Sequence, residues 1–216
     1  MKILEIFNSI DGEGLRAGEL ASFIRTAGCN LHCGYCDTAY SIPKENKNAR
    51  EMEWSEITAL DLYHNVTLTG GEPLLQPDIW KVAGALARAG YAVNIETNGS
   101  LPFLFPHQRP GIMITADWKT AYSGMRGQMN KAGLYTCLGT GDVLKAVCGS
   151  EEDLGADLEE VLEIQRHSGC WVYLSPCWGF PTARIVEEMK RRKLEGKIRV
   201  QLQLHKYIWN PNAREV

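Results

Sequence analysis

The stretch VTLTGGEPLLQPDIWKVAGALARAGYAVNI, residues 66–95, determines the fold class, because it reads as a strand, a helix and a second strand. VTLT (66–69) and YAVNI (91–95) are apolar runs with the length of buried strands. Between them, Gly90 stands where a helix is expected to end. Apolar residues recur before it at helical spacing, at Ile79, Val82, Ala83, Leu86 and Ala87. Strands joined by a helix pair in parallel, so this stretch predicts a βαβ unit.

The same alternation continues toward the C-terminus. Two further amphipathic segments, 157–169 and 181–196, read as helices. Gly169 and Gly196 are placed to end them, and Pro181 suits a first helical turn. Strand-like runs separate these helices, at 111–115, 142–147, 170–175 and 198–204. The repeated pattern predicts an α/β protein with a parallel sheet.

The N-terminal part has a different pattern. ILEIF (3–7) and ASFIRTAG (21–28) read as strands with no helix between them. The polar segment 43–54 reads as an exposed insertion. Because 216 residues suit one hydrophobic core, we expect residues 1–216 to form a single domain.

Polar or glycine-rich segments follow five of the predicted strands. They are TGGEP (69–73), ETNGS (96–100), DWK (117–119), SPCWG (175–179) and HKY (205–207). In parallel α/β proteins the carboxyl ends of the strands meet at one edge, where ligands bind. The sequence therefore predicts one large site on one face.

Composition narrows the class of protein. The formal charge is -3, and the basic run 190–197 is balanced by the acidic run 151–160, so we expect solvated helix faces and no nucleic-acid partner. No apolar run reaches the roughly 20 residues that span a membrane, and the first residues lack the pattern of a signal peptide. We therefore expect a cytoplasmic protein without a membrane partner.

The cysteines point to a metal site. In a reducing compartment, seven cysteines are more often free thiols or metal ligands than disulfides. CNLHCGYCDTAY (29–40) has the spacing C-x3-C-x2-C, and the second pair of ligands that structural zinc needs is absent. Cys148 and Cys170 stand in apolar runs and read as buried, while Cys137 and Cys177 are widely spaced from them. A fourth ligand from one of these four stays open. Three thiolates on a four-iron, four-sulfur cluster would leave one iron free to bind a substrate.

A second motif, TGGEP at 69–73, strengthens this interpretation. Its two glycines allow close approach of a ligand, and the carboxylate of Glu72 could accept hydrogen bonds from an ammonium group. The cysteine loop and this turn together resemble the radical S-adenosylmethionine superfamily. The resemblance implies one 4Fe-4S cluster per chain, held by three cysteines, and S-adenosylmethionine bound at the open iron. It implies reductive cleavage of that cofactor to a 5′-deoxyadenosyl radical.

Further motifs resemble one family in that superfamily, 7-carboxy-7-deazaguanine synthase. They are EIFNSIDGEG (5–14), FIRTAGCN (23–30), CDT (36–38), ETNGS (96–100) and LHKY (204–207). The resemblance implies a partial, incomplete TIM-type β/α barrel of about six parallel strands. It implies a carbon–nitrogen lyase that converts 6-carboxy-5,6,7,8-tetrahydropterin to 7-carboxy-7-deazaguanine with loss of ammonia, in queuosine biosynthesis. It also implies a homodimer and a reducing partner such as flavodoxin or ferredoxin.

The resemblance also assigns residues, beginning with the metals: Cys29, Cys33 and Cys36 hold the cluster, and the hydroxyl of Thr38 binds Mg²⁺. S-adenosylmethionine contacts are expected at Tyr35, Gly71, Glu72, Asp117, Trp118, Lys119, Ser175, Pro176, Cys177 and Trp178. Pterin contacts are expected at Ile10, Asp11, Gly12, Glu13, Arg25, Thr69, Glu96 and His205. Of these, Arg25 suits a carboxylate because a guanidinium binds it with two parallel hydrogen bonds. Glu96 and His205 are the candidate catalytic residues.

The chain departs from the family pattern at three places. It has IDGEG (10–14) where many relatives have LQGEG, DWK (117–119) where many have SPK, and residues after Pro211 where some relatives end. Two alternatives share the cysteine loop. A glycyl-radical-enzyme activating enzyme would act on a partner protein, and SIDGEG, ETNGS and LHKY would have no clear role there. A non-catalytic iron–sulfur electron carrier would have four cysteine ligands close together in sequence.

Overall fold

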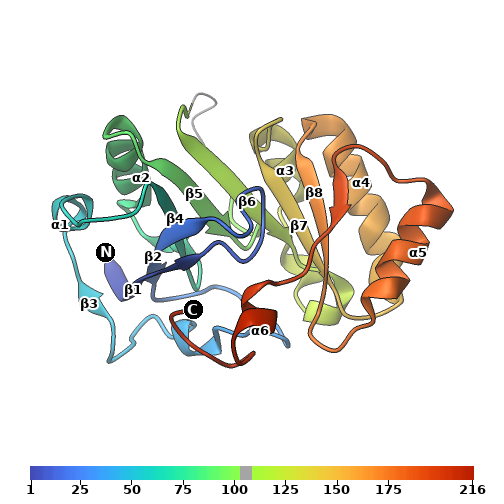
Figure 1. The fold of residues 1–216 in the computed structure, drawn as a ribbon, viewed down its shortest axis with the longest axis horizontal. Helices are drawn as coiled ribbons and strands as arrows, with labels where there is room; N and C mark the ends of the chain where they lie inside the picture. The colour runs from blue at the N-terminus through green and yellow to red at the C-terminus, as the bar shows by residue number, and fades with distance from the viewer. Residues whose placement is uncertain (103–108) are drawn as a thin grey trace.

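The computed structural model describes residues 1–102 and 109–216, and its centre is a nine-stranded sheet in the order β3-β1-β2-β4-β5-β6-β7-β8-β9 (Figure 1). The strands are β1 (Lys2–Ile10), β2 (Leu20–Thr26), β3 (Arg50–Glu51), β4 (Asn65–Gly70), β5 (Ala92–Thr97), β6 (Ile112–Trp118), β7 (Val143–Cys148), β8 (Trp171–Pro176) and β9 (Ile198–Val200). All neighbouring pairs from β2 to β9 are parallel. Only β1 and β3 join antiparallel. The predicted α/β class is confirmed.

Helices cover the outside of this sheet, with α1 and α2 near one end and α4 and α5 near the other (Figure 1). The helices of the described residues are α1 (Trp54–Thr58), α2 (Ile79–Arg88), α3 (Lys131–Cys137), α4 (Ala156–Ser168), α5 (Thr182–Arg192) and α6 (His205–Ile208), of which α6 lies apart from the outer layer, beside the cysteine loop. Short 3-10 turns are η1 (Ala39–Ser41), η2 (Pro73–Leu75), η3 (Ala121–Ser123), η4 (Arg126–Gln128) and η5 (Glu152–Leu154).

The βαβ unit forms as its periodicity predicts. Ile79, Val82 and Leu86 of α2 are fully buried in the core that also contains Ile95 and Ile114 of the sheet. Each such side chain contributes about 1.5 to 3 kcal/mol by leaving water. Gly90 follows α2 with a φ of 94°, a left-handed conformation that favours glycine.

Two predicted boundaries are wrong. Helix α5 ends at Arg192, before Gly196, because Lys193 already adopts the left-handed conformation with φ 52°. The last strand ends at Val200 instead of continuing to 204, although its apolar and polar residues alternate. The Gln201 amide still donates to Leu174 of β8, but its side chain bonds the backbone of Gly14, and the amide of Leu204 bonds Gly12, so tertiary contacts replace the ladder after Gln201.

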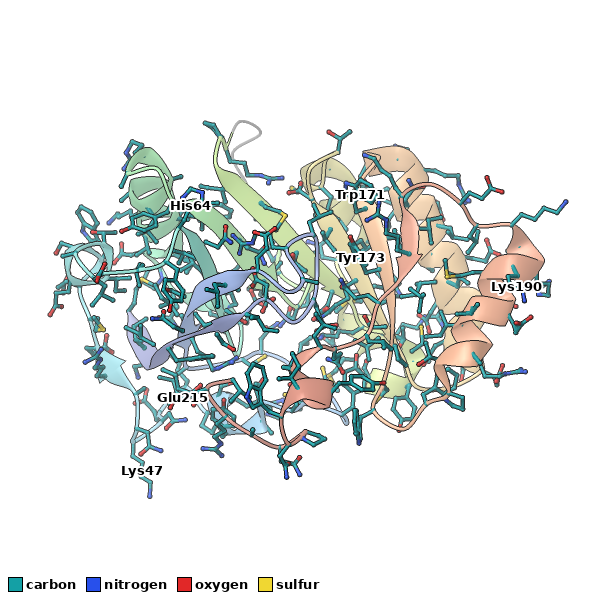
Figure 2. The ribbon with its side chains drawn as sticks, in the orientation of Figure 1. Lys47, His64, Trp171, Tyr173, Lys190 and Glu215 are labelled. Carbon is teal, nitrogen blue, oxygen red and sulfur yellow. The ribbon has the colours of Figure 1, made fainter. Side chains whose placement is uncertain are left out.

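The two charge runs differ in burial. Lys190 lies on the outer surface of α5 and pairs with Glu187, as expected for a solvated face (Figure 2). The acidic run 151–160 is not only a solvated face. Asp153 accepts hydrogen bonds from the backbone of Gly149 and Ser150, and Asp157 is fully buried. Buried carboxylates remain stable where backbone amides satisfy them.

The connection between β1 and β2, residues 11–19, crosses to the far end of the sheet. The amide of Gly14 donates to Gln201 Oε1 at 2.6 Å, and Gln201 Nε2 donates back to the Gly14 carbonyl at 3.0 Å. The amide of Leu204 donates to the carbonyl of Gly12 at 3.1 Å. Further along the connection, Arg16 Nη1 donates to the carbonyl of Ala92, the first residue of β5. The connection therefore ties together strands that the open sheet leaves apart.

Segment 43–54 is largely exposed, and Lys47 points away from the body of the molecule (Figure 2). It is not entirely irregular, since it includes β3 and the buried Met52. Within residues 1–102 and 109–216, no helix has both the length and the apolar character required to span a membrane.

Candidate active site

A cavity of about 510 Å³ lies at the carboxyl ends of the parallel strands. The structure brings most of the predicted site residues to its wall. They are Ile10, Gly12, Glu13, Arg25, Cys29, Cys33, Tyr35, Cys36, Thr38, Thr69, Gly71, Glu96, Asp117, Lys119, Cys177, Trp178 and His205. The five polar segments thus converge as parallel topology requires.

The three cysteines of the loop open onto this cavity. Cys29 Sγ accepts hydrogen bonds from the amide of Leu31 at 3.4 Å and from Asn98 Nδ2 at 3.7 Å. Such donors stabilise a thiolate that ligates iron. No three His, Cys, Asp or Glu side chains in the described part of the chain are arranged to hold a metal ion by themselves. A multi-iron cluster, which is larger than an ion, fits this thiol set in its chemistry.

The glycine turn after β4 packs directly on the cysteine loop. A Cβ atom on Gly71 would lie 2.3 Å from the carbonyl oxygen of Gly28, so only glycine fits there. The amide of Glu72 donates to that same carbonyl at 2.8 Å. The two motifs that define the site therefore form one continuous surface.

Glu72 does not line the cavity. Its carboxylate is fully buried and accepts hydrogen bonds from Leu74 N, Thr97 Oγ1 and Asn98 N, at 3.0, 2.8 and 2.6 Å. Burial raises its pKa to about 7 in spite of these donors. The carboxylate joins the loops after β4 and β5, and its contact with the cofactor ammonium group stays a prediction.

The DWK segment divides between the two faces of β6. Asp117 and Lys119 line the cavity. Trp118 points to the opposite face, where its indole Nε1 donates to Asp157 Oδ1 at 3.0 Å in the core. Because strand side chains alternate between faces, the Trp118 indole lies in the core, and the cofactor contact expected at this residue stays a prediction.

The segment SPCWG (175–179), which spans the end of β8, divides in a similar way. Cys177 and Trp178 reach the cavity, and the Trp178 ring packs edge-on against Tyr207 at 5.6 Å between centroids. Ser175 and Pro176 are buried and do not line the cavity, and the cofactor contacts expected at these two residues stay predictions. Ser175 Oγ instead donates to Glu13 Oε1 at 3.2 Å.

Asp11 is a buried residue of the connection 11–19. It does not line the cavity, although a pterin contact is predicted there. Its carboxylate accepts a hydrogen bond from Thr67 Oγ1 at 2.8 Å and pairs with Arg16 Nε at 2.8 Å. Burial raises its pKa against the opposing effect of Arg16. Asp11 therefore anchors the connection 11–19 to Thr67 of β4.

Lys145 is an interior cation that the sequence reasoning missed. Its Nζ lies 3.0 Å from Glu13 Oε2 and 3.3 Å from Asp117 Oδ1, and Lys119 Nζ lies 2.6 Å from Asp117 Oδ2. Burial alone would raise the pKa of Asp117, yet the two ammonium groups hold it below its usual value. A lysine inside the apolar run VLKAV is the signal that could have revealed this cluster.

His205 and Thr38 both line the cavity. A Cβ atom on Gly12 would be 2.4 Å from His205 Nδ1, so glycine allows the imidazole its position. Burial lowers the pKa of His205. Lys206, the next residue, pairs with Asp37 at 3.0 Å and fastens α6 to the cysteine loop. Thr38 Oγ1 lies 3.7 Å from Cys36 Sγ.

Known proteins resemble the chain in sequence. The model of the Radical SAM superfamily matches residues 23–108. A 7-carboxy-7-deazaguanine synthase of Clostridium acetobutylicum is 39% identical over 220 residues, covering 100% of this chain and 99% of the relative. One from Methanospirillum hungatei is 40% identical over 215 residues, covering 98% and 86% of the two chains.

Solved structures resemble it in fold. The crystal structure of QueE from Escherichia coli superposes with a TM-score of 0.71 at 23% identity and covers 94% of both chains. The structure of SuiB from Streptococcus suis bound to a precursor peptide gives a TM-score of 0.60 at 13% identity, over 83% of this chain and 48% of that one. The predicted barrel architecture is thereby confirmed.

Proposed function

The chain belongs to the 7-carboxy-7-deazaguanine synthase family of the radical SAM superfamily, and we propose how its cavity divides the two ligands of that reaction. The enzyme is a lyase of 7-deazapurine biosynthesis, converting 6-carboxy-5,6,7,8-tetrahydropterin to 7-carboxy-7-deazaguanine with loss of ammonia. The observation that carries the proposal is that the cysteines and Arg25 open onto one cavity.

The cofactor side comprises the cysteine loop and its surroundings. Cys29, Cys33 and Cys36 would hold the 4Fe-4S cluster, and the backbone at Gly71 would lie against S-adenosylmethionine. When bound, these groups supply an organic radical that removes a hydrogen atom from the substrate. Tyr35, which stacks on Tyr122 at 6.1 Å, provides an aromatic surface for the adenine.

Asp117 and Lys119 complete this side. Carboxylate oxygens accept hydrogen bonds from hydroxyl groups, so Asp117 suits a ribose. The ammonium group of Lys119 would neutralise the Asp117 carboxylate and fix its orientation. Cys177 and Trp178 would close the side nearest α6.

The substrate side extends from Arg25 to His205. Arg25 would bind the pterin carboxylate through its two terminal nitrogens, with charge-assisted hydrogen bonds. Glu96 and Glu13 would accept hydrogen bonds from the donor-rich pyrimidine edge, with Ile10, Gly12 and Thr69 filling the remaining wall. The lowered pKa of His205 keeps its imidazole neutral near pH 7, so it can accept a proton during ring rearrangement.

Thr38 would supply one hydroxyl ligand to Mg²⁺, with substrate oxygens and waters as the others. Mg²⁺ commonly keeps several waters and few protein ligands. We further propose a single-domain subunit with an insertion at 43–54, a homodimer, and a cytoplasmic flavodoxin or ferredoxin as reductant; family membership supports these assignments.

The decisive experiment is turnover of the reconstituted protein under anaerobic conditions. Dithionite, S-adenosylmethionine, Mg²⁺ and 6-carboxytetrahydropterin are expected to give the deazapurine and ammonia in equal amounts. Absence of deazapurine at every Mg²⁺ concentration would refute the assignment. An EPR spectrum of the reduced cluster should also change when S-adenosylmethionine is added, whereas a simple electron carrier would show no change.

A further inference from the structure

Two pairs of side chains face each other across β1 and β2 beside the cavity. In the antiparallel register, Glu5 stands opposite Arg25, and Phe7 stands opposite Phe23. The two phenyl rings stack at 5.1 Å, and the Arg25 guanidinium lies 5.7 Å from the centre of the Phe7 ring. Arg25 is thus supported on one face by an aromatic ring.

Glu5 binds Arg25 from the side. Arg25 Nε lies 2.8 Å from Glu5 Oε2, and the two side chains are 13% and 11% exposed. In the described residues, neither Nη1 nor Nη2 of Arg25 makes a hydrogen bond. Because Nε is occupied, the two terminal nitrogens are left as a fork, and Arg25 lines the cavity. A fork of this kind is the geometry that binds a carboxylate with two parallel hydrogen bonds.

Tyr40 in turn holds Glu5. Its hydroxyl donates to the same Glu5 Oε2 at 3.0 Å. Burial raises the pKa of Tyr40 to about 12, so the hydroxyl keeps its proton and remains a donor. The guanidinium of Arg214 covers the Tyr40 ring at 3.8 Å. Tyr40 lies on η1, which directly follows the cysteine loop.

We propose that Glu5 is a positioning residue that fixes the plane of Arg25, with Tyr40 fixing Glu5, so that the cavity selects pterins carrying a carboxylate. The inference rests on the proposed function, since it concerns how the proposed substrate is chosen. Glu5 does not line the cavity, whereas Tyr40 does, and neither role requires contact with the substrate. They act through the orientation of Arg25.

An opposite expectation follows if Glu5 acts only through its charge. A buried anion beside Arg25 would weaken its attraction for a second carboxylate. Removing Glu5 would then strengthen binding of the carboxylated substrate. If Glu5 positions Arg25, removing it releases the guanidinium to other rotamers and binding weakens. The two roles therefore predict changes of opposite sign.

The experiment measures equilibrium binding to the reconstituted enzyme with S-adenosylmethionine and no reductant, so that no turnover occurs. The two ligands are 6-carboxytetrahydropterin and tetrahydropterin without the carboxylate. The measured quantity is the ratio of their dissociation constants. The variants are Glu5→Ala, Glu5→Gln and Tyr40→Phe, and Glu45→Gln is the matched control because it alters a surface glutamate paired with Lys2.

Wild type is expected to prefer the carboxylated ligand by at least about tenfold, the range of hydrogen bonds to charged groups. Glu5→Ala should remove most of this preference. Glu5→Gln retains an acceptor oxygen for Arg25 Nε and should keep it within about threefold, while Tyr40→Phe should lower it about two- to fivefold. Glu45→Gln should leave it unchanged.

An unchanged or increased preference in Glu5→Ala would overturn the inference. If Glu5→Ala does not fold, Tyr40→Phe decides, and an unchanged preference in that variant overturns it. A wild-type chain that binds both pterins equally also overturns it. A wild-type chain that binds neither pterin instead counts against the proposed function, so the two failures can be distinguished.

Discussion

The ammonium nitrogen of Lys145 lies between the two ligand sides of the cavity, 3.0 Å from Glu13 and 3.3 Å from Asp117. Lys145→Met would leave Glu13 without its cation, whereas Asp117 would retain Lys119. Removing one partner of a buried ion pair is expected to lower the free energy of unfolding by about 3 kcal/mol. Urea denaturation measures this change. Lys190→Met, which breaks an exposed pair, should change stability by less than about 0.5 kcal/mol.

Gly12→Ala is expected to displace His205, because the new Cβ would lie 2.4 Å from Nδ1. A displacement of about 1 Å at a reacting group can reduce turnover about 100-fold. Steady-state kinetics with 6-carboxytetrahydropterin measures the loss. Gly127→Ala is the control, because open space surrounds that position and activity should be retained. Equal activity in both variants would show that the position of His205 does not matter for turnover, and would refute its proposed catalytic role.

Cys33→Ala should prevent assembly of the cluster, because only two thiols of the loop remain. Iron content and visible absorbance after anaerobic reconstitution give the result, together with cleavage of S-adenosylmethionine. Cys170→Ala changes a buried thiol that does not line the cavity and should retain both. Cluster retention by Cys33→Ala would show that another residue provides the ligand.

Glu72 should make stability depend on pH. In the folded chain its pKa is about 7, against 4.5 for an unperturbed glutamate, so the folded state holds the proton more tightly. The stability this provides is complete below about pH 4.5 and is lost as pH rises through 7. At 1.36 kcal/mol per pKa unit, the loss is about 3 kcal/mol. Denaturation at pH 5 and pH 8 captures most of this loss, and Glu72→Gln should remove this part of the difference.

Thr38→Ala tests the proposed magnesium ligand. The variant should need roughly tenfold more Mg²⁺ for half-maximal turnover, while uncoupled cleavage of S-adenosylmethionine stays the same. Thr38→Ser keeps the hydroxyl and should behave like wild type. An identical Mg²⁺ dependence in all three proteins would exclude Thr38 as a ligand.

The sequence predicted the elements whose periodicity and packing agree. The strand–helix–strand unit at 66–95 forms because the same residues that suit a helix, such as Val82 and Leu86, also meet the sheet. The strand expected at 198–204 failed where long-range contacts compete. The Gln201 amide still donates to Leu174 of the neighbouring strand β8, while its side chain bonds Gly14, and no local pattern reports a partner so far away.

The sequence predicted which segments reach the cavity better than it predicted which of their side chains face it. Motif spacing located the cavity wall, yet it could not tell which side chains of a motif face inward. Trp118 and Glu72 belong to the predicted segments but point into the protein, because strand alternation and buried hydrogen bonds decide their direction. Glu5 and Tyr40 were missed for the opposite reason. Their role depends on contact with Arg25, which no spacing reveals.

The contacts of the 11–19 connection also set an order of assembly during synthesis. Gly14 and Gln201 are separated by 187 residues, so their hydrogen bonds form only when nearly the whole chain has left the ribosome. The cysteine loop and its glycine turn are complete when less than half of the chain has emerged. A nascent chain therefore presents its thiols long before Glu13 acquires its partners Ser175 and Gln203, and the pterin side is the last part of the enzyme to mature.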